Sequence, residues 1–290
     1  MTVFCLGSIN IDHVYRLPAL PQAGETLSAT SHTPGLGGKG INQSVAALRA
    51  GAEVVHIGAV GQGDAWIEAQ LTAHGIALDR IARVTQGTGH AIVAVDDAGE
   101  NQIIIHSGAN LAQDLGMIDA ALATAQPGDI LLVQNETSHQ VGAARIARAR
   151  GLRVFYSAAP FALEPLREVL PHVTHLLVNA GEAEALVKAT GTALPDQPVD
   201  AVIVTRGAQG AEWISAGTEP LFQPSFPVTP VDTTGAGDCF AGSLAAALDR
   251  GQTPADALRY AAAAAALQVT RPGAAPAMPD RAQVERLLAG

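Results

Sequence analysis

The residues best suited to chemistry stand in residues 231–242, VDTTGAGDCFAG, where two glycines and a carboxylate precede an alanine-rich stretch. Gly235 and Gly237 allow a sharp turn that leaves backbone N–H groups uncovered, and such groups at a helix N-terminus attract an anion. Asp238 would repel a phosphate that was merely held there. It is better suited to taking a proton from a nucleophile while the amides stabilise the oxygens under attack. An ordinary turn in which Asp238 starts the helix is an equal alternative.

The elements that must position this turn follow from the pattern of apolar residues. An extended run from Phe226 to Val231 precedes the turn, and a helix, roughly Asp238 to Arg250, follows it. Elsewhere, short apolar runs typical of strands buried on both faces alternate with helical stretches that end at glycine. The predicted strands are Thr2–Leu6, Glu53–Ile57, Ile130–Val133, Leu152–Tyr156, His175–Val178 and Ala201–Thr205. This alternation predicts an α/β fold, with a central, mostly parallel sheet flanked by helices and ligands at the carboxyl ends of its strands.

Polar side chains follow the first predicted strand. Asn10 and Asp12 lie beyond its carboxyl end and share one face if the chain stays extended, so an amide and a carboxylate would grip neighbouring hydroxyls. A loop cap is the alternative for Asn10 alone. In residues 35–43, GLGGKGINQ, the glycines permit close approach to a polar ligand, and Lys39 and Asn42 supply donors. Gly40 stands where a P-loop has Ser or Thr, so that assignment is rejected; a flexible hinge stays open.

Carboxylates also follow two later strands. Glu136 comes just after the strand that ends at Val133, and Asn179 with Glu182 comes after His175–Val178. Each acid would also suit the N-terminus of the next helix, which is the simpler explanation for either one alone. Because several polar sites follow successive strands of one sheet, we expect them to meet at a shared ligand site.

Two regions depart from this alternation. His13–Leu17 and Thr26–Thr33 have the composition of strands, as do Ala91–Val95 and Gln102–His106, which flank the turn residues Asp97-Ala98-Gly99. We expect a small sheet that forms a lid from about residues 12–36 and 88–108, within a single domain spanning residues 1–290. Such a sheet needs covering, which a substrate pocket and a second subunit would provide.

Composition excludes several classes of function. The chain is 48% hydrophobic and 15% charged with a net charge of -10 and no basic cluster, which argues against nucleic-acid and membrane partners. Cys5 and Cys239 are its only cysteines, as expected for a reducing compartment. The N-terminus has the pattern of neither a signal peptide nor a membrane span, so a cytoplasmic location is expected.

Taken together, the motifs resemble those of the ribokinase-like (PfkB) family of sugar kinases, from Val3 to about Pro279. DTTGAGD at residues 232–238 matches the family's C-terminal signature, and GGKGINQ at residues 37–43 matches its N-terminal one. GSINID at residues 7–12, HSGAN at residues 106–110, and Asn179 with Glu182 agree in order and spacing.

The resemblance implies ATP-dependent phosphorylation of the primary hydroxyl of a sugar, with conversion of D-ribose to ribose 5-phosphate favoured. Asp238 would be the base, and the transferred phosphoryl group would be stabilised by the amides of Gly235, Ala236 and Gly237. The sugar would be held by Asn10, Asp12, Gly38, Lys39, Asn42, Glu136 and Asp238. ATP, and Mg²⁺ through water on Glu182, would be held by Asn179, Glu182, Thr205, Gly207 and Gly237.

Members of the family often bind a monovalent cation near the anion site. The resemblance implies K⁺ ligands, mostly backbone oxygens, at Asp232, Thr234, Gln268, Arg271 and Gly273. Ala277 stands where relatives often have a serine hydroxyl, which leaves K⁺ activation open. The segment Ser157-Ala158-Ala159-Pro160 also departs from the Asn-Pro or Asp-Pro of many relatives.

Other functions fit the same residues. The substrate could be another sugar, a keto-deoxy acid or a nucleoside, or the protein could be a non-catalytic sugar-binding regulator on a kinase scaffold. A nicotinamide-dependent dehydrogenase is disfavoured because the turn after the first strand, Gly7-Ser8-Ile9-Asn10, lacks the dinucleotide-binding fingerprint. The resemblance further implies a homodimer formed through the lid.

Overall fold

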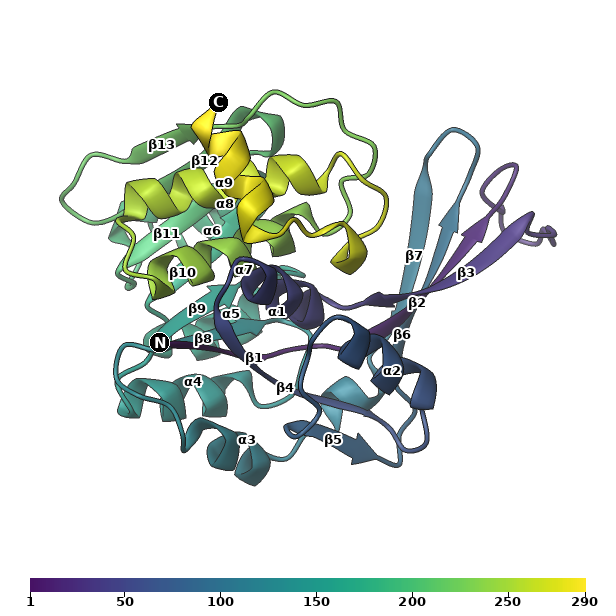
Figure 1. Ribbon diagram of the computed structural model, residues 1–290, viewed down its shortest axis with the longest axis horizontal. Helices are drawn as coiled ribbons and strands as arrows, with labels where there is room; N and C mark the ends of the chain where they lie inside the picture. Colours follow the sequence, from purple (N-terminus) through teal and green to yellow (C-terminus); the bar gives the residue numbers. More distant parts are fainter.

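A computed structural model describes residues 1–290 and shows a large sheet between two layers of helices, with a small sheet that projects from one end (Figure 1). The large sheet has nine strands in the order β13-β12-β11-β10-β9-β8-β1-β4-β5. The strands are β1 (Thr2–Leu6), β4 (Glu53–Gly61), β5 (Ile81–Val84), β8 (Ile130–Gln134), β9 (Arg153–Ser157), β10 (His175–Asn179), β11 (Ala201–Thr205), β12 (Gly210–Ile214) and β13 (Leu221–Pro224). Only the β11–β12 and β12–β13 pairs are antiparallel, so the mostly parallel sheet is confirmed.

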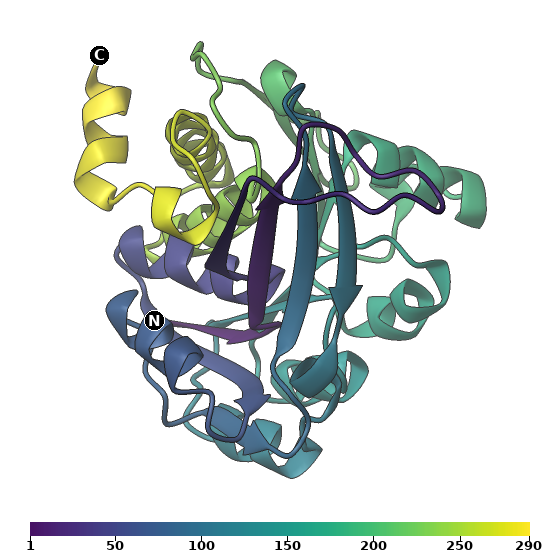
Figure 2. The ribbon, with the colours of Figure 1, turned by 90° about the vertical axis from the view of Figure 1, so that its right-hand side faces the viewer.

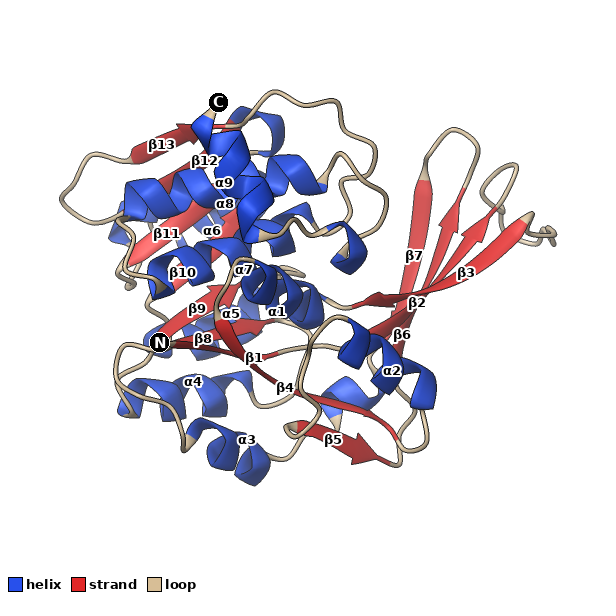
Figure 3. Ribbon diagram, in the orientation of Figure 1, coloured by secondary structure: helices blue, strands red, loops and turns tan.

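The helices form the outer layers (Figure 3). They are α1 (Lys39–Arg49), α2 (Ala65–Ala73), α3 (Leu115–Leu122), α4 (Gln140–Ala149), α5 (Leu163–Val169), α6 (Ala180–Thr190), α7 (Ala236–Asp249), α8 (Pro254–Gln268) and α9 (Arg281–Ala289). Short 3₁₀ turns lie in the connections at Gly108–Leu111, Leu170–His172, Leu194–Asp196, Gly207–Gln209 and Ala275–Ala277. No helix combines the length and apolar character that a membrane crossing requires.

Alternation along the strands divides the interior into two cores. Val3 and Cys5 of β1 face a core shared with α1, α2, α7, α8 and α9, while Phe4 and Leu6 face the core shared with α3, α4, α5 and α6. Because both faces are covered, the strands are apolar throughout, as predicted from their sequence.

The small sheet consists of β3 (Ser31–Gly37), β2 (Asn10–Arg16), β6 (Gly89–Val95) and β7 (Asn101–His106), in that spatial order. Figure 2 shows its strands face-on, in front of the main sheet. The predicted strand Thr26–Thr33 was misplaced, because β3 pairs with β2 from Ser31 to Gly37. Gly37 permits this register, since a side chain there would overlap the Asp12 carboxylate.

The main sheet also differs from the prediction at both edges. Residues 226–230 form no strand, and the sheet ends instead at β12 and β13, which were not predicted; β5 at the other edge was also missed. Pro227 and Pro230 explain the absence of a strand, because proline cannot donate to a ladder of hydrogen bonds. The N–H of Val231 donates to the carbonyl of Val269 at 2.7 Å, which attaches this segment to α8.

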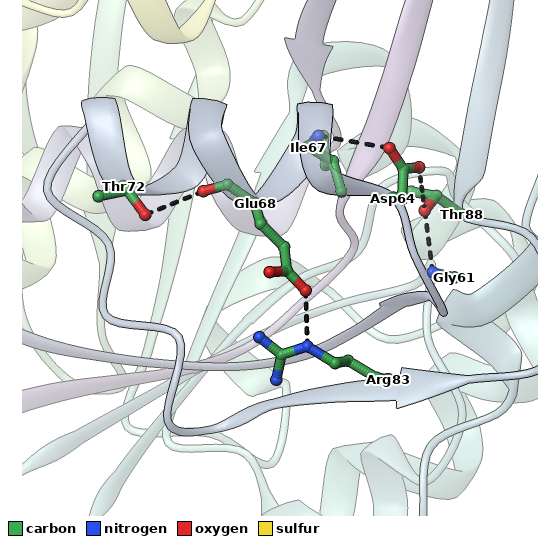
Figure 4. A network of polar contacts seen from close by, with 7 residues as sticks. All are labelled: Gly61, Asp64, Ile67, Glu68, Thr72, Arg83 and Thr88. Atoms are coloured by element: carbon green, nitrogen blue, oxygen red, sulfur yellow. Dashed lines mark hydrogen bonds and ion pairs between the residues drawn. The ribbon is translucent and has the colours of Figure 1, made fainter.

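A polar network anchors the base of the small sheet to the main body (Figure 4). Thr88, just before β6, donates its hydroxyl to Asp64 Oδ2 at 2.7 Å and accepts the N–H of Gly61 at 2.9 Å. The other oxygen of Asp64 caps α2 by accepting the N–H of Ile67. The neighbouring Gly89 lies so close to Asn10 and Asn110 that no Cβ would fit there. The network therefore fixes the start of β6, the strand that pairs with β2 and its polar residues.

The position of Asp238 depends on close contact between α1 and α7. A Cβ on Gly242 would overlap the carbonyl oxygen of Gln43 and lie 2.8 Å from the Cβ of Ala46. We predict that Gly242→Ala lowers the free energy of unfolding by about 1–3 kcal/mol, because the helices must separate. Denaturant unfolding measures this change. Gly181→Ala is the control, since its Cβ would make an ordinary contact at 3.5 Å; equal stability of the two variants would contradict the packing argument.

Candidate active site

Asp238 lies in the first turn of α7, and both its oxygens accept amide hydrogen bonds. Asn42 Nδ2 donates to Oδ2 and Gln43 Nε2 donates to Oδ1, each at 3.1 Å. Gln134 Nε2 donates in turn to Gln43 Oε1 at 2.8 Å, which fixes the orientation of that amide. A carboxylate that is only 8% exposed is thus held in one position by neutral donors.

Burial sets the proton affinity of this group. It raises the pKa of Asp238 to about 6, against the opposing effects of Lys39 and the two amides and with a small contribution from Glu136. Burial alone would lower the pKa of Lys39, but the surrounding carboxylates Asp238, Glu136 and Glu182 outweigh it and raise that pKa. Lys39 therefore stays charged among several acids.

The turn before α7 presents backbone donors beside Asp238. Gly235 is the N-cap residue, in the left-handed conformation with φ 77°. The N–H of Ala236 donates to the carbonyl of Thr233 at 3.2 Å, whereas no protein acceptor is found for the N–H groups of Gly235 and Gly237. The N–H groups of Gly235 and Gly237 are thus free at this turn, whereas the N–H of Ala236 also helps to close it.

Asn10 and Glu136 are held by residues of the neighbouring loops. Asn10 Oδ1 accepts from Asn110 Nδ2 at 2.8 Å, and Asn110 Oδ1 accepts the N–H of Ile9 at 2.9 Å. Glu136 Oε2 accepts from the Ser8 hydroxyl and from the N–H of Lys39. These contacts connect β2, the glycine-rich loop before α1 and the loop after β8, so the three segments lie next to one another.

Asp12 faces the same region, as the alternation along β2 predicted. Burial, together with the negative charges of Glu136 and Asp238, raises its pKa to about 6. Gly38 lies with φ 100° directly against the carbonyl of Ser8, so only glycine fits between the loop and the first strand. The residues expected to hold a sugar are therefore brought together with Asp238.

Two adjoining cavities lie on the other side of Asp238. One, of about 200 Å³, is lined by polar residues from several strand ends and by the turn of α7, namely Lys39, Ser157, Asn179, Glu182, Thr205, Gly235, Ala236, Gly237 and Asp238. The other, of about 440 Å³, is mostly apolar and is lined by Thr205, Gly207, Phe226, Val228, Ala236, Gly237, Ala262 and Ala266, among others. Their shared residues join a polar compartment to an apolar one.

Asn179 and Glu182 have a structural role as well. Asn179 Oδ1 accepts the N–H of Glu182 at 2.9 Å, and Glu182 Oε2 accepts the N–H of Asn179 at 2.8 Å. This reciprocal pair caps α6, which is the simpler of the two roles weighed from the sequence. Both residues nevertheless line the polar cavity.

A divalent metal fits this cavity only as a partner of phosphate. No group of three or more His, Cys, Asp or Glu side chains is arranged to hold a metal ion. Mg²⁺ typically keeps several waters and is bound through one or two carboxylates together with substrate phosphates. Glu182 and Asp238 around the polar cavity fit that mode of binding.

The residues expected to bind a monovalent cation are also brought together, but the carbonyls of Thr234 and Gly273 face the amide of Gln268. Gln268 Nε2 donates to the carbonyls of Thr234 at 2.8 Å and Gly273 at 3.0 Å. Asp232 accepts the N–H groups of Thr234 and Gly273 through its two oxygens. The Arg271 side chain points away, toward Gln283. This arrangement does not fit a resident cation.

Four residues that contact the site were not assigned roles from the sequence: Ser8, Gln43, Asn110 and Gln134. All lie within or beside the motifs that were recognised, and Gln43 directly follows Asn42. Their neutral side chains gave no sign that they would meet a carboxylate or an amide from a distant part of the chain.

Comparison with known proteins agrees with this site. Residues 2–281 match the model for the pfkB family of carbohydrate kinases. A ribokinase of Bacillus subtilis is 37% identical over 294 residues, which cover 98% of each chain. The crystal structure of ribokinase from Thermotoga maritima superposes with a TM-score of 0.90 at 31% identity over 100% of both chains. Arabidopsis thaliana ribokinase complexed with ribose and ATP gives a TM-score of 0.87 at 30% identity, covering 100% of this chain and 99% of that one.

The pKa of Asp238 predicts how stability depends on pH. The folded protein holds this proton up to about pH 6, whereas the ordinary pKa of an Asp carboxyl is 3.8. Ionisation of Asp238 therefore destabilises the fold as pH rises through this window. Relative to the wild type, Asp238→Asn should gain stability on the order of 2–3 kcal/mol between about pH 4 and pH 7.

Denaturant unfolding at several pH values measures this difference. Asp97→Asn, which removes the same charge from an exposed turn, provides the baseline. A difference between Asp238→Asn and the wild type that stays constant across the window would show that burial does not shift the pKa of this carboxyl.

Proposed function

The chain belongs to the pfkB family of carbohydrate kinases, and we propose that it transfers the γ-phosphoryl group of ATP to the primary hydroxyl of D-ribose. The products are ADP and ribose 5-phosphate. The observation that carries the proposal is the position of Asp238, a buried carboxylate between a group of polar side chains on β2 and α1 and a polar cavity that opens into an apolar one. The ribose and ATP of the Arabidopsis complex support the choice of substrates.

In the proposed reaction Asp238 acts as the general base. The hydroxyl of the sugar gives its proton to the carboxylate as its oxygen attacks the γ-phosphorus, and the bond from that phosphorus to the bridging oxygen of ADP breaks. The raised pKa of about 6 leaves the carboxylate mostly ionised at neutral pH while making it a stronger base than an exposed Asp. Asn42 and Gln43 hold it in position without adding a charge that would lower the pKa further.

The turn of α7 supplies the charge stabilisation. The free N–H groups of Gly235 and Gly237 point from a helix N-terminus, where negative charge that develops on the phosphoryl oxygens is favoured. The N–H of Ala236, which also bonds the carbonyl of Thr233 in the turn, is the third proposed donor. Phosphoryl transfer depends mainly on such positioning and electrostatics.

The sugar is held from the other side of Asp238. Asn42 Oδ1 is buried without a partner in the protein, so it is free to accept from a sugar hydroxyl while its Nδ2 donates to Asp238. Asn10 is locked by Asn110 into one orientation. The further proposed contacts to the sugar come from Asp12, Gly38, Lys39 and Glu136.

We assign the two adjoining cavities to ATP. The apolar one, with Thr205 and Gly207 at its edge, suits a nucleobase, and the polar one suits the phosphates beside Lys39 and Asn179. Mg²⁺, held through water by Glu182, supplies neutralisation of phosphate charge when bound. The need for ATP and the two free cysteines, Cys5 and Cys239, support a cytoplasmic location.

The small sheet serves, in this proposal, as a lid made of about residues 12–36 and 88–108 within one domain of residues 1–290. β7 is exposed along its whole length, and Ile103, Ile104 and Ile105 are 53–67% exposed. Side chains alternate along a strand, so apolar side chains are exposed on both faces of this sheet edge. These exposed side chains favour a second copy as a covering, which gives a homodimer through the lid. A closed lid would exclude water and so limit hydrolysis of ATP.

The proposal is tested by measuring ADP release from ATP and Mg²⁺ with a panel of sugars, keto-deoxy acids and nucleosides. D-ribose should give the highest kcat/KM. Turnover with another acceptor would overturn the substrate and keep the mechanism. Tight sugar binding without turnover on any acceptor would identify a non-catalytic regulator instead.

Replacement of the base gives a sharper test. Asp238→Asn should lower kcat by about 10²–10⁴-fold, because a positioned base is lost, with little change in the affinity for the sugar. In the wild type, kcat/KM should fall about tenfold per pH unit below about pH 6, where Asp238 becomes protonated.

Asp249→Asn is the matched control, since Asp249 is a buried carboxyl at the opposite end of the same helix. Steady-state kinetics and equilibrium binding of the sugar should separate the two variants. Equal losses of kcat in both, or a lost affinity with unchanged kcat in Asp238→Asn, would contradict the assigned role.

A further inference from the structure

We propose that the side-chain amide of Gln268 replaces a monovalent cation beneath the turn of α7, so that the stability and activity of this protein do not depend on K⁺. The activity part of this inference rests on the proposed kinase function, because the turn is the one that carries Gly235 and Gly237. The stability part does not, and it can be measured on the protein without substrates.

The geometry of Gln268 carries the proposal. Its side chain is completely buried at the end of α8, and its Nε2 lies 2.8 Å from the carbonyl oxygen of Thr234 and 3.0 Å from that of Gly273. These two oxygens belong to loops that are far apart in the sequence. An ion bound to both oxygens would lie close to each of them, in the space that Nε2 occupies. The amide and a cation therefore exclude one another.

The orientation of the amide follows from its surroundings. Rotation by 180° would turn Gln268 Oε1 toward two carbonyl oxygens, which are acceptors only. In the observed orientation Oε1 is buried without a hydrogen-bond partner in the protein. Because an unsatisfied buried acceptor costs free energy, the two bonds from Nε2 must outweigh that cost. The side chain thus joins the loops with a partial positive charge directed at the carbonyls.

Three other oxygens in this region have protein donors. Asp232 Oδ1 accepts the N–H of Thr234 at 2.9 Å, and Oδ2 accepts the N–H of Gly273 at 2.8 Å. The main-chain carbonyl of Gln268 accepts the N–H of Arg271 at 3.1 Å. Ala277, which is buried, has only a methyl group to offer. The loops are therefore connected by hydrogen bonds within the protein, and a cation would bind the carbonyls of Thr234 and Gly273 together only if the amide of Gln268 were removed.

The contact bears on the reaction because Thr234 directly precedes Gly235. A Cβ on Gly235 would lie 2.8 Å from the Cβ of Ala274 and 3.3 Å from its Cα, which shows how tightly the turn packs against the loop after α8. By holding Thr234 and Gly273 together, the amide fixes the turn that directs the free N–H groups toward the proposed phosphoryl site.

The experiment compares melting temperatures and turnover in KCl, NaCl and tetramethylammonium chloride at equal ionic strength. For the wild type we expect turnover to change by less than about twofold between the salts and the melting temperature to stay the same. Gln268→Ala removes the amide and opens space, so its melting temperature should fall by about 5 °C and its kcat by about tenfold, the effect of two net hydrogen bonds. K⁺, and not tetramethylammonium, should restore part of both losses.

Gln197→Ala is the matched control, because Gln197 is a buried amide that donates to the carbonyl of Thr192 at 3.0 Å away from this site. It should lose stability without any response to K⁺. Gln268→Met, which keeps the volume and lacks the donors, should be destabilised and also fail to respond. If the alanine variant does not fold, the comparison of the wild type in the three salts still tests the proposal.

Three results would overturn the proposal. One is a wild-type melting temperature raised by K⁺ and not by tetramethylammonium, which would show that a cation binds despite the amide. The second is a Gln268→Ala variant as stable as the wild type. The third is a loss in Gln268→Ala that K⁺ leaves unchanged, as in the control. Absence of turnover on every acceptor, with the melting behaviour as expected, would instead refute the proposed function alone.

Discussion

One constraint governs the whole site: the carboxylate of Asp238 must be able to ionise although it is buried in a packed interior. Asp238 is buried, which raises its pKa to about 6, yet it lies at a helix N-terminus that favours negative charge. Neutral amides from Asn42 and Gln43 hold its two oxygens, and the single cation Lys39 stands nearby. A closer cation would make the group a weak base, and loss of the amides would leave a buried charge without donors.

Close packing of the backbone is the means by which these groups meet. α1 carries Asn42 and Gln43, and α7 carries Asp238, so the distance between the two helices sets the hydrogen bonds to the carboxylate. Gly242 removes the side chain that would otherwise separate the helices, and Gly40 lets the start of α1 lie directly on Gly7 after the first strand. The glycines of the motifs are thus required by contacts between backbone segments as well as by the ligand.

The turn before α7 is likewise held in place by contacts from other parts of the chain. Its residues make few hydrogen bonds of their own, and the connections come from Asp232 and from the completely buried Gln268. The donors that remain free on Gly235 and Gly237 therefore belong to a rigid segment. Rigid donors cost little reorganisation when charge develops, which is the condition under which backbone amides stabilise a reacting group most effectively.

The sequence by itself determined the type of fold and the identity of most residues around the site. Apolar runs between helices predicted the parallel strands β1, β8, β10 and β11 nearly to the residue, because strands covered on both faces must be apolar throughout. Glycines and acids in the motifs at residues 37–43 and 232–238 identified the loops that meet at the site. Local composition was sufficient there because the chemistry needs particular residue types at fixed spacing.

Only the tertiary structure decided the partners of those residues. The register of β3, the antiparallel edge strands β12 and β13, and the route of residues 226–230 all depend on pairing with distant segments. The same holds for the neutral residues Gln43, Asn110 and Gln134, and for the amide of Gln268 that meets Thr234 and Gly273. A glutamine has no pattern of its own in a sequence, since whether it anchors a carboxylate, replaces an ion or lies in solvent depends on what the fold brings within 3 Å of it.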